Sequence, residues 1–381
     1  MFDVIVSGAG PAGATAALVL ARGGARVLLL DRATFPRDTF CGDTLNPGAV
    51  ATLTRLGIEE RLEPYALPID GMIVSGERGV SVRGEYGRGV TGRAILRRDL
   101  DMAIVTAAGE AGARVEQGVL VRAPLVDTSG SSPRVRGVVI QGRDGGDVRI
   151  PAPLVIGADG RRSRLAHAFG LLRHPKRPRR WAVGAYFEDV AGLSRMGEMH
   201  VRRGCYIGVA PVPSGLTNVC IVTDDRRRLR DPQRLLEDVI RGDWLLAGRF
   251  RGASMVTPPV STGPLAADCA RPGVRGLLLA GDAAGFIDPM TGDGIHFAIR
   301  GGELAARAIL SGATGAADLY EQLDRMRRRA FRAKWRFNRT LRRLVAVPSA
   351  VEAASIAASF APGLLHRAIA YAGDVPAARA S

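Results

Sequence analysis

A glycine-rich turn between an apolar strand and a helix of small residues is the feature that most limits how this chain can fold. The turn holds Gly8, Gly10 and Gly13, and the strand before it is expected over residues 2–7. In such a turn the first glycine permits a tight bend, the second lets the backbone approach a pyrophosphate, and the third lets helix and strand pack closely. The N-terminus of the helix offers unpaired N–H groups to phosphate. The pattern predicts a Rossmann-like unit that binds a dinucleotide.

Three further acidic turns follow buried strands. The strand expected over residues 26–30 ends in Asp31, which can accept hydrogen bonds from a ribose 2′-hydroxyl. An acid there favours a ribose without a 2′-phosphate, and therefore FAD or NAD before NADP. Residues 154–160 end in Asp159-Gly160, and residues 276–284 contain Gly281-Asp282. Each motif is weak alone, but the set in this order is specific.

At these positions the sequence resembles the flavoprotein superfamily of p-hydroxybenzoate hydroxylase, most closely the geranylgeranyl reductase family, over roughly residues 1–310. The resemblance implies FAD as cofactor, with Asp282 on its ribitol and the turn over 289–294 aimed at the N1–C2=O edge of the flavin. A helix N-terminus there would stabilise the negative charge of reduced flavin. Arg97 matches the arginine that contacts the FAD phosphates, and Arg98 is a neighbouring alternative. The residues expected to contact FAD are Gly8, Gly10, Ala12, Gly13, Asp31, Arg32, Arg37, Cys41, Gly42, Arg97, Asp159, Gly160, Gly281, Asp282, Pro289, Gly292, Gly294 and Ile295.

The reductant side of the site departs from the family pattern. In the family, Asp-Gly is often followed by serine and then arginine; here Ser163 is present, but Ala166 takes the place of the arginine, with Arg164 nearby. A second glycine-rich turn after a strand is absent from the sequence. NAD(P)H is therefore expected to visit the flavin transiently, or a partner reductase to supply the electrons.

Three residues are catalytic candidates. Cys41, in a Cys-Gly-Asp pattern similar to the reductase family near the isoalloxazine ring, is either a functional thiol or a residue packed in a tight loop. His296 and Asp293 either contact substrate or flavin, or belong to the start of the helix. The five histidines lack metal-ligand spacing, and the four cysteines form no C-x-x-C pair, so no metal site is expected.

Strand patterns separated by Gly/Pro turns fill residues 181–267, where the superfamily has its substrate sheet. Cys205–Pro211 and Asn218–Thr223 predict a hairpin. The family's Tyr-x-Trp-x-Phe-Pro motif aligns with Tyr206, Gly208, Ala210 and Pro211. Loss of the two aromatic residues predicts a wider pocket and weakens the case for isoprenoid double-bond reduction.

The C-terminal part contains an amphipathic pattern over residues 321–344. One stripe is largely apolar, and the opposite one holds arginines. The arginine stripe is either solvated or contacts an anionic membrane surface or an acidic acyl-carrier protein. The apolar stripe comprises Leu323, Met326, Ala330, Phe337, Leu341 and Leu344, and the arginine stripe comprises Arg325, Arg328, Arg329, Arg332, Arg336, Arg339 and Arg343.

The net charge of +16 comes almost wholly from arginine, since Lys176 and Lys334 are the two lysines. This bias is typical of a GC-rich genome, and aromatic residues are 5%, so nucleic acid is not expected as a partner. The N-terminus lacks signal-peptide character and the apolar runs are too short to span a bilayer, which favours a cytoplasmic or membrane-peripheral location.

The expected fold is α/β: a mostly parallel Rossmann-like FAD-binding domain of the GR2 type, an interleaved antiparallel substrate domain and a helical tail. The FAD-binding domain is assigned to 1–65, 90–175 and 270–315, the substrate domain to 66–89 and 176–269, and the tail to 316–381.

The expected function is FAD-dependent oxidation or reduction of a hydrophobic small molecule. The wider pocket favours an NAD(P)H-dependent monooxygenase that uses O₂ on an aromatic, polyketide or isoprenoid metabolite. The pattern around Cys41 and over 289–295 favours the alternative, a reductase of carbon–carbon double bonds. A non-enzymatic flavin- or lipid-binding module is the third reading.

Overall fold

The computed structural model describes residues 1–77, 80–130, 132–142, 144–175, 179–312, 319–345 and 362–375. A six-stranded sheet of order β21-β22-β12-β1-β2-β8 carries the glycine turn. Its strands are β1 (Val4–Ser7), β2 (Val27–Asp31), β8 (Arg114–Gln117), β12 (Leu154–Gly157), β21 (Gly273–Val274) and β22 (Leu277–Leu279). All neighbours are parallel except β21 and β22. The carboxyl ends of the motif-bearing strands therefore meet at one edge, where α/β sheets bind ligands.

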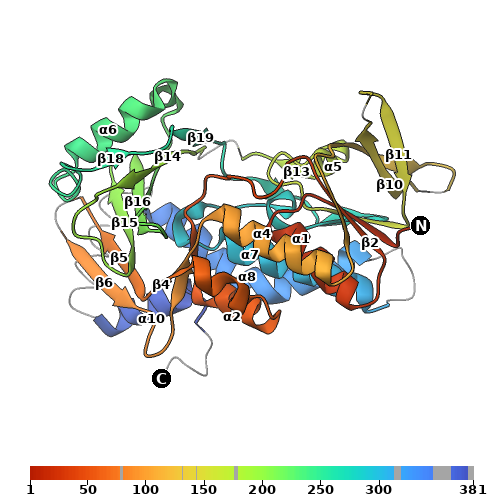
Figure 1. Ribbon diagram of the computed structural model, residues 1–381, viewed down its shortest axis with the longest axis horizontal. Coiled ribbons are helices and arrows are strands. Elements are labelled where there is room, and N and C mark those ends of the chain that lie inside the picture. The colour runs from red at the N-terminus through yellow and green to blue at the C-terminus, as the bar shows by residue number, and fades with distance from the viewer. Residues whose placement is uncertain are drawn as a thin grey trace.

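Both faces of this sheet are covered. Helices α1 (Pro11–Arg22), α4 (Arg97–Glu110) and α7 (Gly294–Leu310) lie side by side on one face (Figure 1). Val4 and Val6 pack under these helices, whereas Ile5 packs toward a three-stranded sheet on the other face. That sheet, which the sequence analysis did not predict, contains β9 (Val121–Asp127), β10 (Arg134–Gln141) and β11 (Asp147–Pro151). Burial on both faces explains the unbroken apolar run of the first strand.

The glycines of the turn act as predicted. A Cβ at Gly13 would lie 1.8 Å from the Gly8 carbonyl oxygen, and a Cβ at Gly8, whose φ is +97°, would lie 2.4 Å from the carbonyl oxygen of Ala158. Helix α1 thus approaches the sheet at a distance that only glycine allows.

The second large sheet has eight strands. It lies on the opposite side of the cavity, described below, from the six-stranded sheet. The predicted hairpin is present as β16 and β17, with Gly208 opposite Cys220. The sheet is antiparallel as predicted, except that β5 pairs in parallel with β15 because the two strands arrive from distant segments. Its strands are β5 (Gly71–Ser75), β6 (Ser81–Glu85), β14 (Trp181–Glu188), β15 (Met196–Arg202), β16 (Cys205–Pro211), β17 (Thr217–Thr223), β18 (Ser254–Met255) and β19 (Val260–Thr262), and α6 (Pro232–Gly242) covers the outer face.

Shorter elements complete the described chain. They are β3 (Thr44–Leu45), β4 (Leu67–Ile69), β7 (Gly92–Ala94), β13 (Leu172–Arg173), β20 (Asp268–Cys269), α2 (Pro47–Arg55), α3 (Glu59–Leu62) and α5 (Arg164–Ala168). The predicted domain boundaries stay a prediction.

Two C-terminal helices pack on the body: α8 (Leu319–Val345) on α7, and α10 (Pro362–Ala372) on β6 (Figure 1). The predicted stripe of α8 is wrong in part. Ala330 is exposed, whereas Arg327 and Lys334 are buried, because each finds buried hydrogen-bond acceptors that periodicity does not reveal. The side chain of Leu344 and all of Lys176 lie outside the described part of the chain. Within the described ranges, every helix is too short or too polar to cross a bilayer.

Candidate functional site

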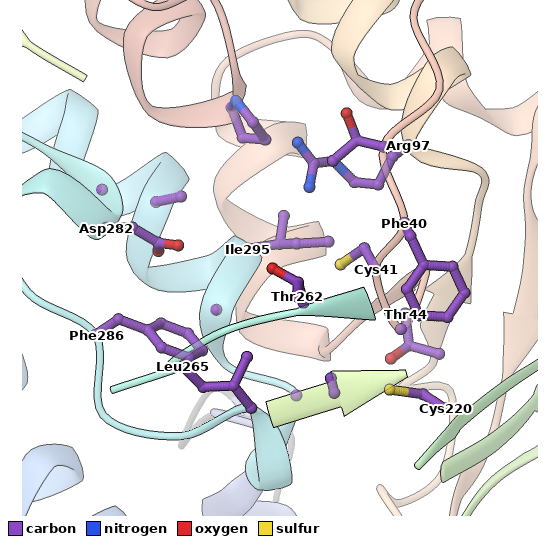
Figure 2. Close-up of a pocket in the computed structure, with 18 of the residues that line it drawn as sticks. Phe40, Cys41, Thr44, Arg97, Cys220, Thr262, Leu265, Asp282, Phe286 and Ile295 are labelled. Carbon is purple, nitrogen blue, oxygen red and sulfur yellow. The ribbon is translucent and has the colours of Figure 1, made fainter. Parts of the chain in front are cut away.

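A continuous cavity of about 1190 Å³ runs from the glycine turn to the inner face of the eight-stranded sheet. Typical small-molecule sites have roughly 300–1,000 Å³, so this cavity has room for a dinucleotide and a second molecule. Figure 2 shows part of it, where Cys41, Arg97, Asp282 and Ile295 come together from distant parts of the chain.

Most residues predicted to bind FAD line this cavity. They are Gly8, Gly10, Ala12, Asp31, Arg32, Arg37, Cys41, Gly42, Arg97, Asp159, Gly160, Gly281, Asp282, Gly292, Gly294 and Ile295. Gly13 does not line it; Gly13 lies behind the turn, against Gly8, and the side chain of Pro289 is outside the described part of the chain. Of the predicted substrate residues, Tyr206, Gly208 and Ala210 line the cavity and Pro211 does not. The role of each residue stays a prediction.

Asp31 is held by the main chain. Its Oδ2 accepts a hydrogen bond from Ala9 N at 2.7 Å, and its Oδ1 accepts one from Ala33 N at 2.8 Å. These bonds fix the carboxylate beside the glycine turn and leave lone pairs for a ribose hydroxyl.

Two arginines at the phosphate end share one buried carboxylate, Asp101. Arg97 Nε and Nη2 donate to its two oxygens at 2.9 and 2.8 Å, and Arg37 Nη2 lies 3.3 Å from Oδ2. Arg37 Nη2 also lies 3.3 Å from where a Cβ on Gly10 would be, so its guanidinium is beside the turn. Arg98 is exposed, pairs weakly with Asp38 and does not line the cavity, which favours Arg97. Asp101 follows Arg97 by four residues, and that i,i+4 spacing is the signal that sequence reasoning missed.

Two further motif acids lie along the middle of the cavity. Burial raises the pKa of Asp282, and Arg161, which sequence reasoning missed although it follows Gly160, opposes this with its Nε at 3.5 Å. Burial also raises the pKa of Asp159, whose Oδ2 accepts from Arg164 N at 2.9 Å.

Four buried atoms in the cavity wall have no hydrogen-bond partner in the described part of the chain: Arg37 Nε, Asp159 Oδ1, Arg161 Nη1 and Thr291 Oγ1. A buried polar group normally has a partner. These donors and acceptors, together with the glycine cradle, fit the phosphates and hydroxyls of FAD.

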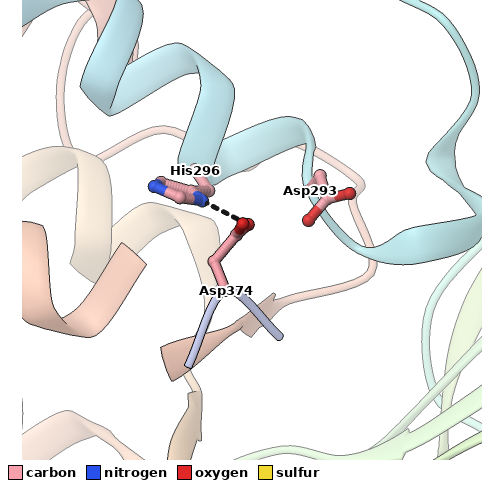
Figure 3. A group of neighbouring side chains, drawn as sticks. All are labelled: Asp293, His296 and Asp374. Carbon is pink, nitrogen blue, oxygen red and sulfur yellow. Dashed lines mark hydrogen bonds and ion pairs between the residues drawn. The ribbon is translucent and has the colours of Figure 1, made fainter. Parts of the chain in front are cut away.

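The start of α7 divides into two sides. Gly292, Gly294 and Ile295 line the cavity, whereas Asp293 and His296 do not. His296 Nδ1 and Asp374 Oδ2 are hydrogen-bonded at 2.9 Å, as Figure 3 shows. Asp293, His296 and Asp374 are spaced closely enough for a metal ion. However, Lys334 Nζ lies 3.2 Å from Asp293 and 2.9 Å from Asp374, so an ammonium already supplies the positive charge.

Cys41 is the catalytic candidate that lines the cavity. Burial raises the pKa of its thiol, and the neighbouring Arg97 opposes this shift. Behind it, Asp43 is fully buried; Oδ2 accepts from Tyr186 Oη at 2.5 Å and from Asn218 Nδ2 at 2.6 Å. Burial raises the pKa of Asp43 to about 6. Asn218 also donates to the Cys41 carbonyl at 2.6 Å, so this cluster fixes the loop. Tyr186 and Asn218 lie 143 and 175 residues along the chain from Asp43, on the paired strands β14 and β17, and carry no signal in the sequence.

The far arm of the cavity is apolar. Tyr206 lines the cavity, and its Oη donates to Asp288 Oδ1 at 2.7 Å, while Arg180 pairs with Oδ2 at 2.9 Å. Burial raises the pKa of Tyr206 well above its ordinary value. The arm is lined by Met72, Val74, Val82, Met199, Val201, Phe337, Leu341, Ala368 and Ile369, from β5, β6, β15, α8 and α10.

Comparisons with known proteins point to flavoproteins. Residues 1–338 match the family model described as FAD binding domain. The chain is 33% identical over 334 residues to the menaquinone reductase of Mycolicibacterium smegmatis, covering 81% of this chain and 76% of the relative. It is 31% identical over 336 residues to digeranylgeranylglycerophospholipid reductase 2 of Methanopyrus kandleri, covering 85% and 82%.

A solved structure of a flavin-dependent brominase triple mutant has a TM-score of 0.84 at 18% identity, covering 100% of this chain and 97% of that one. This likeness shows the shared fold alone.

Proposed function

We propose that this chain, which belongs to the FAD-binding domain family related to p-hydroxybenzoate hydroxylase and is an FAD-dependent oxidoreductase, reduces carbon–carbon double bonds of an isoprenoid lipid or quinone. The observation that carries the proposal is the apolar arm. It continues from Gly292, Gly294 and Ile295, the predicted flavin edge, to aliphatic side chains such as Met199 and Ile369. An apolar arm of this kind suits a polyprenyl chain.

The relatives support a reductase more than the monooxygenase that Gly208 and Ala210 favoured. Both relatives named above are reductases, and their names describe a quinone and an isoprenoid lipid. The missing aromatic pair then widens the pocket for a bulkier substrate and does not change the reaction. Oxygenation remains the second candidate on that observation.

Reduction needs a hydride and a proton for each double bond. Bound FAD, reduced by NAD(P)H, would supply the hydride, and a side chain would supply the proton. The Cys41 thiol lines the cavity, and burial, which raises its pKa, keeps its proton on Sγ. The Tyr206 hydroxyl is also protonated, but its hydrogen is committed to Asp288. Cys41 is therefore the favoured proton donor.

Substrate delivery is proposed to involve an anionic membrane surface, with the enzyme cytoplasmic and membrane-peripheral. The arginine stripe of α8 is exposed, as predicted, and the same helix lines the apolar arm through Phe337 and Leu341. Ala368 both lines the arm and is exposed, so the wall there is thin. Binding to anionic vesicles that weakens with salt and with Arg336→Glu plus Arg339→Glu would support this; equal binding of neutral vesicles would count against it.

Anaerobic turnover tests the reaction. The FAD-loaded protein is reduced with NAD(P)H or dithionite and mixed with menaquinone or a digeranylgeranyl lipid, and the products are identified by mass spectrometry. A gain of two hydrogens per double bond is expected. A product that gains oxygen only in air, with no hydrogenated product without air, would replace the reductase by the monooxygenase.

A further inference from the structure

Asp293 stands where a helix-capping residue belongs, but it does not cap. It precedes α7, and its side chain makes no hydrogen bond to the first N–H groups of that helix. An aspartate at this position usually accepts from one of them. The N–H groups of Gly294, Ile295 and His296 consequently have no hydrogen-bond partner in the described part of the chain. Two of these residues line the cavity at the predicted flavin edge.

Side chains from α8 and the side chain of Asn46, which precedes α2, draw the Asp293 carboxylate away from the helix. Oδ1 accepts from Asn46 Nδ2 at 2.9 Å and lies 3.2 Å from Lys334 Nζ, while Oδ2 accepts from Asn338 Nδ2 at 2.8 Å. Asp293 and Lys334 are 1% and 5% exposed, so water screens this charge pair little.

The shape of this position suits an ammonium. Lys334 Nζ also donates to Asp374 Oδ2 at 2.9 Å and to the carbonyl oxygens of Tyr371 and Ala372 at 2.8 and 2.6 Å. A compact point charge can be surrounded in this way, whereas a planar guanidinium cannot. In a chain whose 53 basic residues include two lysines, this buried position holds one of them.

We infer that Lys334 is a positioning residue for the flavin, acting through Asp293. It neutralises that carboxylate and holds it off the start of α7, so that the N–H groups and the positive dipole end of the helix are left to the N1–C2=O edge of FAD. The inference rests on FAD binding and not on the proposed double-bond reduction, so either can fail alone.

The test uses the flavin itself as its readout. In Lys334→Met, Asp293 is released to accept from its own helix and loses its counter-charge. Both effects oppose the reduced flavin. The FAD reduction potential, measured against reference dyes, is expected to become more negative, and reduced FAD to bind about tenfold less tightly relative to oxidised FAD. Lys334→Arg should not restore the wild-type potential, and Arg241→Met, which removes an exposed charge from α6, should match the wild type.

The double variant Lys334→Met plus Asp293→Ala tests whether Lys334 acts on the flavin through Asp293. Removal of the carboxylate should restore the potential, because nothing then competes for the helix N–H groups. If Lys334→Met is too unstable, Asn338→Ala, which removes the other α8 donor to Asp293, should shift the potential in the same direction. A wild-type potential in these single variants, or a double variant no better than Lys334→Met, would overturn the inference even where thermal stability falls.

Discussion

Asp101 is closed to solvent, yet both arginines at the phosphate end depend on it for their position. Asp101→Asn keeps the shape of the side chain but removes the charge that holds the two guanidinium groups. Charge-assisted hydrogen bonds are worth about 1.5–3 kcal/mol, so we expect the dissociation constant of FAD to rise roughly tenfold or more. Asp99→Asn, the same change on the same helix but outside the cavity lining, is the control. Fluorescence titration of the apoprotein with FAD measures both, and equal affinities would remove Asp101 from the phosphate site.

Asp43 makes the stability of the protein depend on pH. Burial raises its folded-state pKa to about 6 from 3.8, so the folded chain holds this proton more tightly than the unfolded chain. The free energy of unfolding therefore contains a contribution that is complete below about pH 4 and is lost as pH rises through 6. For a shift of about two units the loss is at most roughly 3 kcal/mol.

Asp43→Asn should remove this pH dependence. Asparagine mimics the protonated acid, and it tolerates the left-handed backbone of this position, where φ is 51°. Urea unfolding of the FAD-loaded proteins from pH 4 to 8 should show the variant gaining on the wild type as pH rises, with most of the gain between pH 4 and 6. Parallel profiles would mean that Asp43 is ionised throughout, held by Tyr186 and Asn218.

Sequence reasoning predicted the residues whose task is local and missed those whose task depends on a distant partner. Gly8 and Gly13 could be assigned because strand, turn and helix are contiguous. Asp293 and His296 could not be placed, since the side of α7 that they occupy is fixed by Asn338 and Asp374, far along the chain.

The crossing of α1 and α7 sets the position of the glycine turn. A Cβ on Gly302 would lie 2.0 Å from the Ala12 carbonyl oxygen, whereas one on the neighbouring Gly301 would find its nearest atom at 3.5 Å. Gly302→Ala must push α7 away from α1, and overpacking of this kind costs roughly 1–3 kcal/mol.

Gly301→Ala is the matched comparison, expected to be neutral or to gain up to about 1 kcal/mol from helix propensity. Chemical unfolding together with FAD content after purification separates the two variants. Only Gly302→Ala should lose both stability and flavin. Similar behaviour of the two would mean that helix propensity, and not the crossing, dominates here.

For whole helices and strands, too, sequence reasoning missed the features that depend on partners far along the chain. The existence and approximate ends of α8 followed from periodicity, but its buried face did not, because it carries Lys334 and Arg327 where an apolar stripe was expected. The parallel pairing of β5 with β15 joins segments more than a hundred residues apart, and no local pattern encodes it.

The molecule as a whole forms its site from parts that alternate along the chain. The six-stranded sheet supplies the glycine turn and the acids, the eight-stranded sheet supplies Tyr206 and Gly208, and α10 from the C-terminal part closes the apolar arm through Ile369. The cofactor end and the substrate end of the cavity are thus built by different elements. A substitution at the substrate end can therefore leave the cofactor end intact.

Gly208 allows this separation to be tested. A Cβ there would meet its nearest atom, the Cys220 carbonyl oxygen, only at 3.8 Å, so a side chain would extend into the cavity. Gly208→Trp, which restores an aromatic residue of the reductase motif, should reduce turnover of a ring-bearing quinone by about tenfold or more, since overpacking costs roughly 1–3 kcal/mol.

A linear digeranylgeranyl lipid should be affected less, and FAD affinity should not change because the cofactor cradle lies on other elements. Gly248→Trp, which adds the same ring to an exposed position, controls for the mass and hydrophobicity of the indole. Gly208→Trp could instead slow the turnover of both substrates equally while FAD affinity stays unchanged. The indole would then obstruct a region that both substrates occupy, and room for a substrate ring would not explain why residue 208 is a glycine. If both substrates turned over at the wild-type rate, the reacting bond would lie away from β16, and the arm between β5 and α10 alone would have to hold it.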